Sequence, residues 1–381
     1  SISTNNDANR HVDSRIPERR IPDYQVVETS MLAKAKAGLE DLFQNLFCSI
    51  IVLVLLAGNV TAHGLTFAMI PKGIDDPNLL QAWYGCKAAA KERGDTCLLL
   101  GDTTDGYFRG QLDAIRNAID RRVDGIMISV TRSDFIAPTG LAEARKANIP
   151  VITYDSDLTE PYQGLRILHV GNDNFSVGLE LAALLRQSMP HGRTLCILSS
   201  GRDDPNLNRR IAGVRHGLRE PVIDHNTIQN TPDTTETSEP LAEGTGWIEY
   251  QRCPLYNKGD QRVALTQLKN ISSLLGIDAV VAVGSWLVDD STLPLQSLLQ
   301  EFGDHRPLLL MATGTLSPEQ EQLVHSGLVQ GYVTIDFFKM GELSYTALRN
   351  IADQHTALPI PELPLKIMRY TEEDPKGRSE M

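Results

Sequence analysis

The sequence predicts an α/β fold with parallel sheets, divided into two similar units. From Leu65 onward, short apolar runs alternate with segments of helical periodicity, which is the pattern of repeated βαβ units. The composition is that of an ordinary soluble globular protein, because 41% of the residues are apolar and 22% are charged. At roughly 150 residues per domain, we expect the 381 residues to form two or three domains.

The first unit begins with a strand and a helix whose starts are marked in the sequence. Residues 65–70 form an apolar run with the length of a buried strand. Asp76 and Pro77 then supply an N-cap and a first-turn proline for a helix that Gly94 is expected to close. The elements expected next are strands at 97–100, 125–129 and 151–154, with helices at 107–122 and 135–148. Successive βα units of this kind predict a parallel sheet with helices on both faces.

The second unit repeats this design. The elements expected after residues 166–170 are helices at 174–188, 206–219 and 260–275 and strands at 194–198, 279–283, 308–311 and 328–335. Residues 231–240 contain no apolar side chain, so we expect this segment to be a surface excursion or a disordered loop.

Charge and motif content argue against nucleic-acid binding and catalysis. There are 36 Lys and Arg against 48 Asp and Glu, a net charge of −12, and no basic cluster offsets the repulsion of a phosphate backbone. The chain has no GxSxG elbow, no phosphate-loop motif, no HExxH and no GxGxxG after a strand. Its nine histidines lack the spacing of metal ligands. We therefore expect no enzyme activity, no metal, no cofactor and no nucleic-acid partner.

An apolar segment near the N-terminus predicts export. Residues 46–57 form an apolar run, and small or modest residues at 60–62 precede His63. The run is shorter than the roughly 20 residues of a membrane-spanning helix and has the length of a signal-peptide core. We interpret residues 31–62 as a signal peptide that starts at Met31, which predicts a periplasmic protein. An uncleaved membrane anchor is the alternative.

The cysteines show no metal or redox motif. Cys48 lies in the proposed signal, and the other four have no CxxC spacing. An even number permits disulfides in an exported protein. Cys86 and Cys97 lie on a predicted helix and the strand after it, and they either pair or remain buried free thiols. Cys196 and Cys253 leave the same choice open.

Polar residues recur at the carboxyl ends of the predicted strands, where open α/β sheets bind ligands. Carboxylates, amides and guanidinium groups offer paired hydrogen-bonding edges that match the vicinal hydroxyls of a sugar. Each residue also has a structural alternative: Asp76 can cap a helix, Asp155 can close a turn, and Arg210 can pair with Asp203 or Asp204. The residues in such positions are Asp76, Asn78, Ser129, Asp134, Asp155, Asp157 and Arg210.

Six short motifs occur in a fixed order between residue 65 and about residue 369. They are Asp76-Pro77 with Gly85, residues 113–119 before 123–126, residues 147–151 running into 155–157, residues 170–174 with Gly178, residues 210–213, and residues 336–341. Each motif is weak alone. Their order and spacing resemble the sugar-binding type I periplasmic binding proteins of ABC transporters, typified by the ribose- and galactose-binding proteins.

The resemblance implies two Rossmann-like lobes joined by a three-strand hinge, with a ligand held between them. The implied divisions are an N-terminal extension and signal peptide (1–62), a first lobe (63–171 and 335–360), a second lobe (172–334), and a second-lobe edge with the C-terminal tail (361–381). Ligand contacts are implied for Asp76, Asn78 and Asp155 in the first lobe and for Arg210 in the second. The implied partners are a sugar or polyol and an ABC permease in the inner membrane, and we expect a monomer.

The sequence departs from the family pattern at several ligand positions. Asn78 and Leu79 stand where the family usually has aromatic residues, so a stacking surface is expected to be missing there. Gly284 and Ser285 stand where Asn-Asp is common, and Trp286 beside them is a candidate for stacking on the ligand. Two further positions differ, with Thr313 in place of an acidic contact and Ile335 in place of a hinge glutamine. These departures leave the identity of the ligand open.

We therefore predict an exported solute-binding protein that captures a small polyhydroxylated ligand and presents it to an ABC permease. A sensor subunit of a membrane signalling receptor is one alternative, and a transcription-regulator core without its DNA-binding domain is another. A periplasmic hydrolase using Asp155 and Asp157 is a third alternative, which would need a second carboxylate across the cleft.

Overall fold

The computed structural model describes residues 64–103, 108–219, 239–241, 246–354, 359–361 and 363–370, together with residues 36, 38–39, 42–44 and 46–47. The chain divides into two units, residues 1–63 and 64–381. None of the described helices combines the length and the apolar character needed to cross a membrane. Most of the predicted signal peptide at 31–62 and most of the apolar-free segment at 231–240 lie outside the described residues.

The first lobe is built on a five-stranded parallel sheet in the order β2-β1-β3-β4-β5. Its strands are β1 (Thr66–Ile70), β2 (Thr96–Leu99), β3 (Gly125–Ile128), β4 (Val151–Tyr154) and β5 (His169–Val170). Its helices are α2 (Pro77–Glu92), α3 (Phe108–Asp120), α4 (Ser133–Ile136), a π-helical turn (Ala137–Leu141), α5 (Ala142–Lys146) and α13 (Phe337–Gln354). All the strands and helices predicted for this unit are confirmed to within a few residues.

The second lobe is built on a sheet in the order β12-β11-β10-β9-β6-β7, with β8 also paired to β6. Every pair is parallel except β11 with β12. The strands are β6 (Thr194–Ser199), β7 (Ile248–Glu249), β8 (Leu255–Tyr256), β9 (Ala279–Ala282), β10 (Leu308–Thr313), β11 (Gly331–Thr334) and β12 (Lys366–Arg369). The helices are α6 (Asn174–Ser188), α7 (Pro205–Arg219), α10 (Gln261–Leu275), α11 (Leu293–Phe302) and α12 (Pro318–His325).

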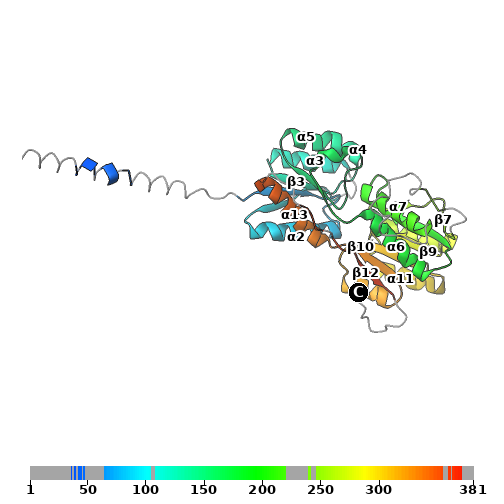
Figure 1. The fold of residues 1–381 in the computed structure, drawn as a ribbon. Coiled ribbons are helices and arrows are strands. Elements are labelled where there is room, and N and C mark those ends of the chain that lie inside the picture. The colour runs from blue at the N-terminus through cyan, green and yellow to red at the C-terminus, as the bar shows by residue number, and fades with distance from the viewer. Residues whose placement is uncertain are drawn as a thin grey trace, which may run out of the picture. The chain divides into compact units, whose positions relative to one another are not determined.

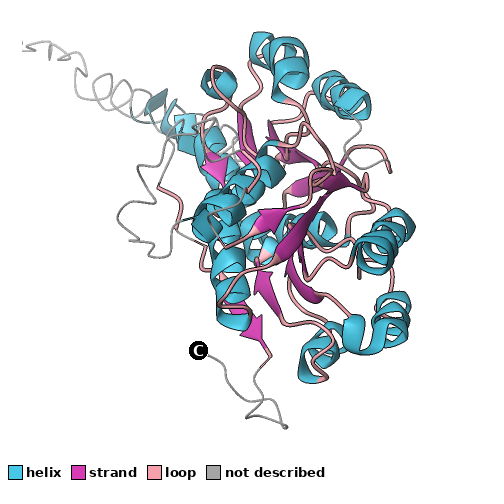
Figure 2. Ribbon diagram, turned by 90° about the vertical axis from the view of Figure 1, so that its right-hand side faces the viewer, coloured by secondary structure: helices cyan, strands magenta, loops and turns pink. Residues whose placement is uncertain are grey.

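The chain passes between the two lobes three times, and the predicted α/β fold class is confirmed. The passages lie between β5 and α6, between β11 and α13, and between α13 and β12. Figure 1 shows the late helix α13 beside the early helix α2, and Figure 2 shows the strands in the interior with helices on both sides. The carboxyl ends of both parallel sheets therefore supply the loops that face the other lobe.

Aspartate side chains begin several of the helices. The carboxylates of Asp76, Asp173 and Asp260 accept hydrogen bonds from the first free backbone N–H groups of α2, α6 and α10. The predicted cap at Asp76 is thus confirmed. Because a capped helix starts at a fixed residue, the side chains in its first turn have a defined position relative to the preceding strand.

Four glycines of the sequence motifs are contact points between helices. A Cβ at Gly85 would collide with the backbone of Phe338, and one at Gly341 with the backbone of Ala82. Gly178 on α6 and Gly213 on α7 approach each other in the same way. Any larger residue would separate the helix axes, so these glycines fix α13 onto the first lobe and α6 onto α7.

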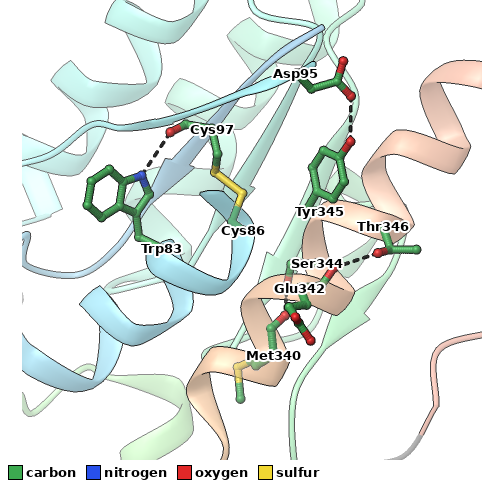
Figure 3. Close-up of a disulfide and its surroundings, with 9 residues drawn as sticks. All are labelled: Trp83, Cys86, Asp95, Cys97, Met340, Glu342, Ser344, Tyr345 and Thr346. Atoms are coloured by element: carbon green, nitrogen blue, oxygen red, sulfur yellow. Dashed lines mark hydrogen bonds between the residues drawn. A yellow bond between two sulfur atoms is a disulfide. The ribbon is translucent and has the colours of Figure 1, made fainter. Parts of the chain in front are cut away.

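All four cysteines outside the proposed signal are paired. Cys86 on α2 bonds to Cys97 on β2, and Cys196 on β6 bonds to Cys253. Figure 3 shows the first disulfide with the Trp83 ring nitrogen, which donates to the Cys97 carbonyl at 3.0 Å. The choice between paired and free thiols is therefore settled in favour of two disulfides.

Candidate functional site

A pocket lies between the two lobes, at the carboxyl ends of both parallel sheets. It encloses a cavity of about 50 Å³. All five residues predicted as ligand contacts line it: Asp76, Asn78, Asp155, Arg210 and Trp286. The other lining residues are Lys72, Leu79, Ser200, Asp204, Asn206, Leu207, Gly284, Ser285 and Phe337. The sequence rule that ligands bind beyond the carboxyl ends of strands therefore led to the pocket of this fold.

Asp155 from the first lobe forms hydrogen bonds on both of its carboxylate oxygens. It follows β4 directly, and its φ of 55° lies in the left-handed region, which aspartate tolerates better than most residues. Oδ2 accepts from the Ser129 hydroxyl at 3.1 Å and from the Asn206 amide at 3.0 Å. Oδ1 lies 3.4 Å from Nη2 of Arg210. The carboxylate therefore joins the first lobe to the second.

Arg210 from the second lobe is held in one orientation by neutral acceptors. Its Nε donates to Oδ1 of Asn174 at 2.8 Å, and its Nη1 donates to the carbonyl of Val283 at 3.0 Å. Burial lowers the pKa of the guanidinium from its ordinary value, and the negative charges of Asp155 and Asp76 oppose this shift. The remaining nitrogen, Nη2, is directed at the pocket carboxylate.

The Asp155 to Arg210 contact is long for a charged hydrogen bond. A well-formed N–H to carboxylate bond measures about 2.8 Å, against 3.4 Å here. Both side chains are nevertheless buried, with exposed fractions of 5% and 4%. At this separation the two groups form a buried ion pair without a short charged hydrogen bond.

Lys72 and Asn206 also line the pocket, and neither was among the predicted ligand contacts. The Lys72 ammonium donates to Oδ1 of Asn206 at 2.6 Å and lies 3.6 Å from Oδ2 of Asp204. Lys72 stands two residues after β1, and Asn206 stands in the first turn of α7 after β6. The same rule that selected Asp76 and Arg210 applies to both positions, so the signal was present in the sequence.

Asp76 and Asn78 occupy the start of α2 in different roles. Oδ1 of Asp76 accepts from the backbone N–H groups of Asn78 and Leu79 at 2.8 and 2.9 Å, so the residue is a helix cap that also lines the pocket. The Asn78 amide reaches the second lobe, where it donates to the Ser285 hydroxyl at 2.8 Å and accepts from Gly314 N–H at 3.0 Å. Asn78 is therefore a second direct link between the lobes.

The pocket has an apolar side as well. Leu79, Leu207, Trp286 and Phe337 line it, and the two aromatic rings are each 6% exposed. Phe337 is the first residue of α13, an aromatic that the sequence analysis did not assign to the site. A ligand in this pocket would therefore meet aromatic rings as well as charged and amide groups.

Asp157 does not join Asp155 at the pocket. Its carboxylate accepts from Nε of Arg166 and from the Thr153 hydroxyl, both at 2.6 Å. Asp134 forms a surface pair with Arg132. The pairing of carboxylates that the hydrolase alternative requires is thus not made by Asp155 and Asp157. In the described part of the chain, no cluster of three or more His, Cys, Asp or Glu side chains has the grouping needed to hold a metal ion.

Comparison with known proteins identifies similar sequences and folds. A family model for a periplasmic binding protein domain matches residues 67–356. A search of curated proteins finds no match.

Three solved structures are similar over most of the described chain. GanP, a glucose-galactose binding protein from Geobacillus stearothermophilus, is 18% identical with a TM-score of 0.62, covering 80% of this chain and 97% of its own. A solute binding protein from Agrobacterium vitis with bound D-fucose is 15% identical with a TM-score of 0.66, covering 82% and 97%. One from Burkholderia graminis with D-arabinose is 21% identical with a TM-score of 0.62, covering 83% and 98%. At these identities the likeness establishes the fold.

Proposed function

Because the chain belongs to the periplasmic binding protein domain family, we propose that it is an exported solute-binding protein that captures a sugar between its two lobes and delivers it to an ABC transporter. The observation that carries the proposal is the pocket itself, which is lined by charged and amide side chains from both lobes and by two aromatic rings. A ligand that touches both lobes favours the closed arrangement by its differential affinity, which is how such hinged proteins respond to binding.

The pocket chemistry favours a neutral, hydroxyl-rich ligand. Asp76 and Asp155 accept hydrogen bonds from hydroxyl groups, while Lys72, Asn78 and Arg210 donate to hydroxyl and ring oxygens. Acidic and basic side chains are both present, so no single ligand charge is selected. Trp286 and Phe337 offer apolar surface to the C–H face of a sugar ring. The sugars bound to two of the structurally similar proteins support this ligand class.

The contacts between the lobes indicate what a sugar would replace. In the pocket, Asp155 bonds to Asn206 and Arg210, and Lys72 bonds to Asn206. A sugar placed in the pocket would substitute its hydroxyls for these partners, so few charged groups would lose hydrogen bonds on binding. The net gain would come from the better geometry of the new bonds and from covering the sugar ring.

A thermal-shift screen of the full chain against D-arabinose, D-fucose, D-galactose and D-glucose tests the proposal. A sugar present at about 100 times its dissociation constant adds about 2.7 kcal/mol to the free energy of unfolding, so at least one should raise the melting temperature. The shift should be smaller in Arg210→Ala. If no sugar or polyol shifts the wild-type protein, the proposed ligand class is wrong.

Export and delivery need separate tests. N-terminal sequencing of protein from the periplasm should give a start near His63, and a start upstream of Met31 would contradict the proposed signal. Deletion of the gene should abolish uptake of the sugar that the screen identifies. Sugar binding with unchanged uptake would overturn the transport role and favour a signalling role.

A further inference from the structure

Asn174 links two of the charged residues of the pocket, Asp155 and Arg210, and is not itself a lining residue. It is the first residue of α6, directly after the passage of the chain from the first lobe to the second. Its Oδ1 accepts from Nε of Arg210 at 2.8 Å, and its Nδ2 donates to the backbone carbonyl of Asp155 at 3.0 Å. One amide group thus contacts the key residue of each lobe.

The orientation of this amide is fixed by the chemistry of its partners. The Nε of an arginine only donates hydrogen bonds, and a backbone carbonyl only accepts them. The Asn174 oxygen must therefore face Arg210, and its nitrogen must face Asp155. No other common side chain of this length supplies one acceptor and one donor at adjacent positions, which makes asparagine specific for this bridge.

Both ends of the bridge act on groups whose direction matters. Asp155 has a φ of 55°, and the bond to its carbonyl helps to hold this left-handed backbone, which sets the direction of the carboxylate. Arg210 keeps Nη2 directed at Asp155 because its Nε donates to Asn174 and its Nη1 donates to the Val283 carbonyl. The close packing of Gly178 against Gly213 fixes the distance between α6 and α7. The Asn174 amide on α6 therefore keeps a fixed distance from Arg210 on α7.

We propose that Asn174 is a positioning residue that aligns Asp155 and Arg210 for the ligand. The proposal rests on the proposed sugar-binding function of the pocket. Loss of the amide should leave both charged side chains in place but misdirected. Sugar affinity should then fall about ten- to hundredfold, the range expected for a lost hydrogen bond to a charged group.

Three variants separate this role from a general loss of stability. Asn174→Ala removes the bonds to Arg210 and Asp155, together with a longer one of 3.4 Å from Nδ2 to the Asn172 carbonyl. Asn174→Asp keeps the acceptor for Arg210 but places a carboxylate oxygen against the Asp155 carbonyl. Gln330→Ala is the matched control, since the half-buried Gln330 amide also bridges a backbone donor, Leu309 N–H, and a backbone acceptor, the Gly327 carbonyl.

The affinity for D-arabinose, or for the sugar of the panel with the largest thermal shift, is measured by calorimetry for each variant together with the melting temperature. We expect Asn174→Ala and Asn174→Asp to weaken binding at least tenfold, and Gln330→Ala to lower the melting temperature without changing affinity. Wild-type affinity in Asn174→Ala would overturn the proposal. Wild-type affinity in Asn174→Asp would show that the hydrogen bond from Asn174 to the Asp155 carbonyl does not contribute to binding.

A second readout needs no sugar. Hydrogen exchange of the Arg210 Nε–H, followed by NMR of protein with ¹⁵N-labelled arginine, should be slow in the wild type and in Asn174→Asp. It should become at least about ten times faster in Asn174→Ala, because the acceptor is lost. An unchanged exchange rate in Asn174→Ala would overturn the positioning role of Asn174, whether or not the wild type binds a sugar. A wild type that binds no sugar would refute the proposed function instead.

Discussion

At the scale of single residues, the pocket is a set of mutually satisfied charges. Lys72 and Arg210 face Asp155 and Asp204 in a space where each side chain is at most 6% exposed. Buried charges are tolerated only when they are paired or hydrogen-bonded. Removing one of them therefore affects both the fold and the affinity for a ligand, and the two effects need separate measurement.

Replacement of Lys72 tests the contribution of its ammonium to binding. Lys72→Met keeps an unbranched side chain of similar length and removes the donor to Asn206. We expect the affinity for the bound sugar to fall about tenfold or more, because a hydrogen bond from a charged group is lost. Calorimetric titration measures the change. Lys87→Met on the exposed face of α2 is the control, and equal affinities in the two variants would contradict the assignment.

His169 predicts a pH dependence of stability. Burial lowers the pKa of its imidazole, partly offset by the negative charge of Asp157. As the pH falls through the ordinary value of about 6.5, the unfolded chain binds a proton before the folded protein does. The free energy of unfolding should therefore decrease in this range, and the decrease should end below the pKa of the folded state.

Urea unfolding between about pH 7.5 and pH 5 measures this effect. The decrease should be smaller in His169→Gln, which cannot take up the proton. Asp157 affects stability only at lower pH. Burial raises the pKa of its carboxyl, but hydrogen bonds from Arg166 and Thr153 outweigh burial and lower it. Its stabilising contribution is lost only below about pH 4. Identical pH profiles for the wild type and His169→Gln would refute the assignment.

The pocket residues were predictable to the extent that each one follows a strand. Asp155 and Arg210 could be selected because they stand directly after a predicted strand or early in the following helix. Their mutual pairing was not predictable, since Arg210 is 55 residues from Asp155 and local alternatives such as Asp203 were available. Phe337 also follows a predicted strand, but the prediction was made from polar side chains, so an aromatic ring was not selected.

At the scale of elements, the two disulfides stabilise loops of different length. Cys86 and Cys97 are separated by 11 residues, whereas Cys196 and Cys253 are separated by 57. In the chain-entropy model, such loops correspond to about 3 and about 4 kcal/mol of stability, respectively. Both bonds join a strand of a parallel sheet to another element, so each also ties a core strand to its surroundings.

Paired alanine substitutions test this difference. Replacing Cys196 and Cys253 should lower the free energy of unfolding by about 4 kcal/mol, and replacing Cys86 and Cys97 by about 3 kcal/mol, as measured by urea denaturation. A reducing agent should not change the free energy of unfolding of a variant in which all four cysteines are replaced by alanine. A larger loss from the shorter loop would contradict the entropic explanation.

Helices and strands were predictable where caps, periodicity and apolar runs agree in one segment. They were not predictable where a strand depends on pairing with a strand far away in the sequence. The buried strands of the parallel sheets are continuous apolar runs, and α6 has both a cap and a helical period, so it was predicted at its observed bounds. The strands β7 and β8 are two residues long and leave no periodic signal. The strand β12 is defined by antiparallel pairing with β11, a partner that precedes it by a whole helix.

At the scale of the whole molecule, hydrogen bonds across the pocket join the two lobes directly. Asn206 in the second lobe bonds to both Lys72 and Asp155 in the first. These bonds involve the same groups that would bind a sugar. A sugar that uses these groups must therefore replace the bonds between the lobes, and weakening these bonds should shift the equilibrium toward separated lobes.

Small-angle X-ray scattering of the unliganded protein tests this shift. Asn206→Ala should have a larger radius of gyration than the wild type, because the lobes lose two bonds across the pocket. Asn208→Ala, at an exposed position two residues further along α7, should match the wild type. An unchanged radius in Asn206→Ala would show that these bonds do not hold the lobes together.

Calorimetric titration of the full chain and of Arg210→Ala with D-arabinose, D-fucose, D-galactose and D-glucose tests the central claim most directly. The wild type should bind at least one sugar with one-to-one stoichiometry, and the variant should bind the same sugar at least about tenfold more weakly. Equal affinity in the two proteins would contradict the assignment of the pocket, and the absence of binding to the wild type would contradict the ligand class.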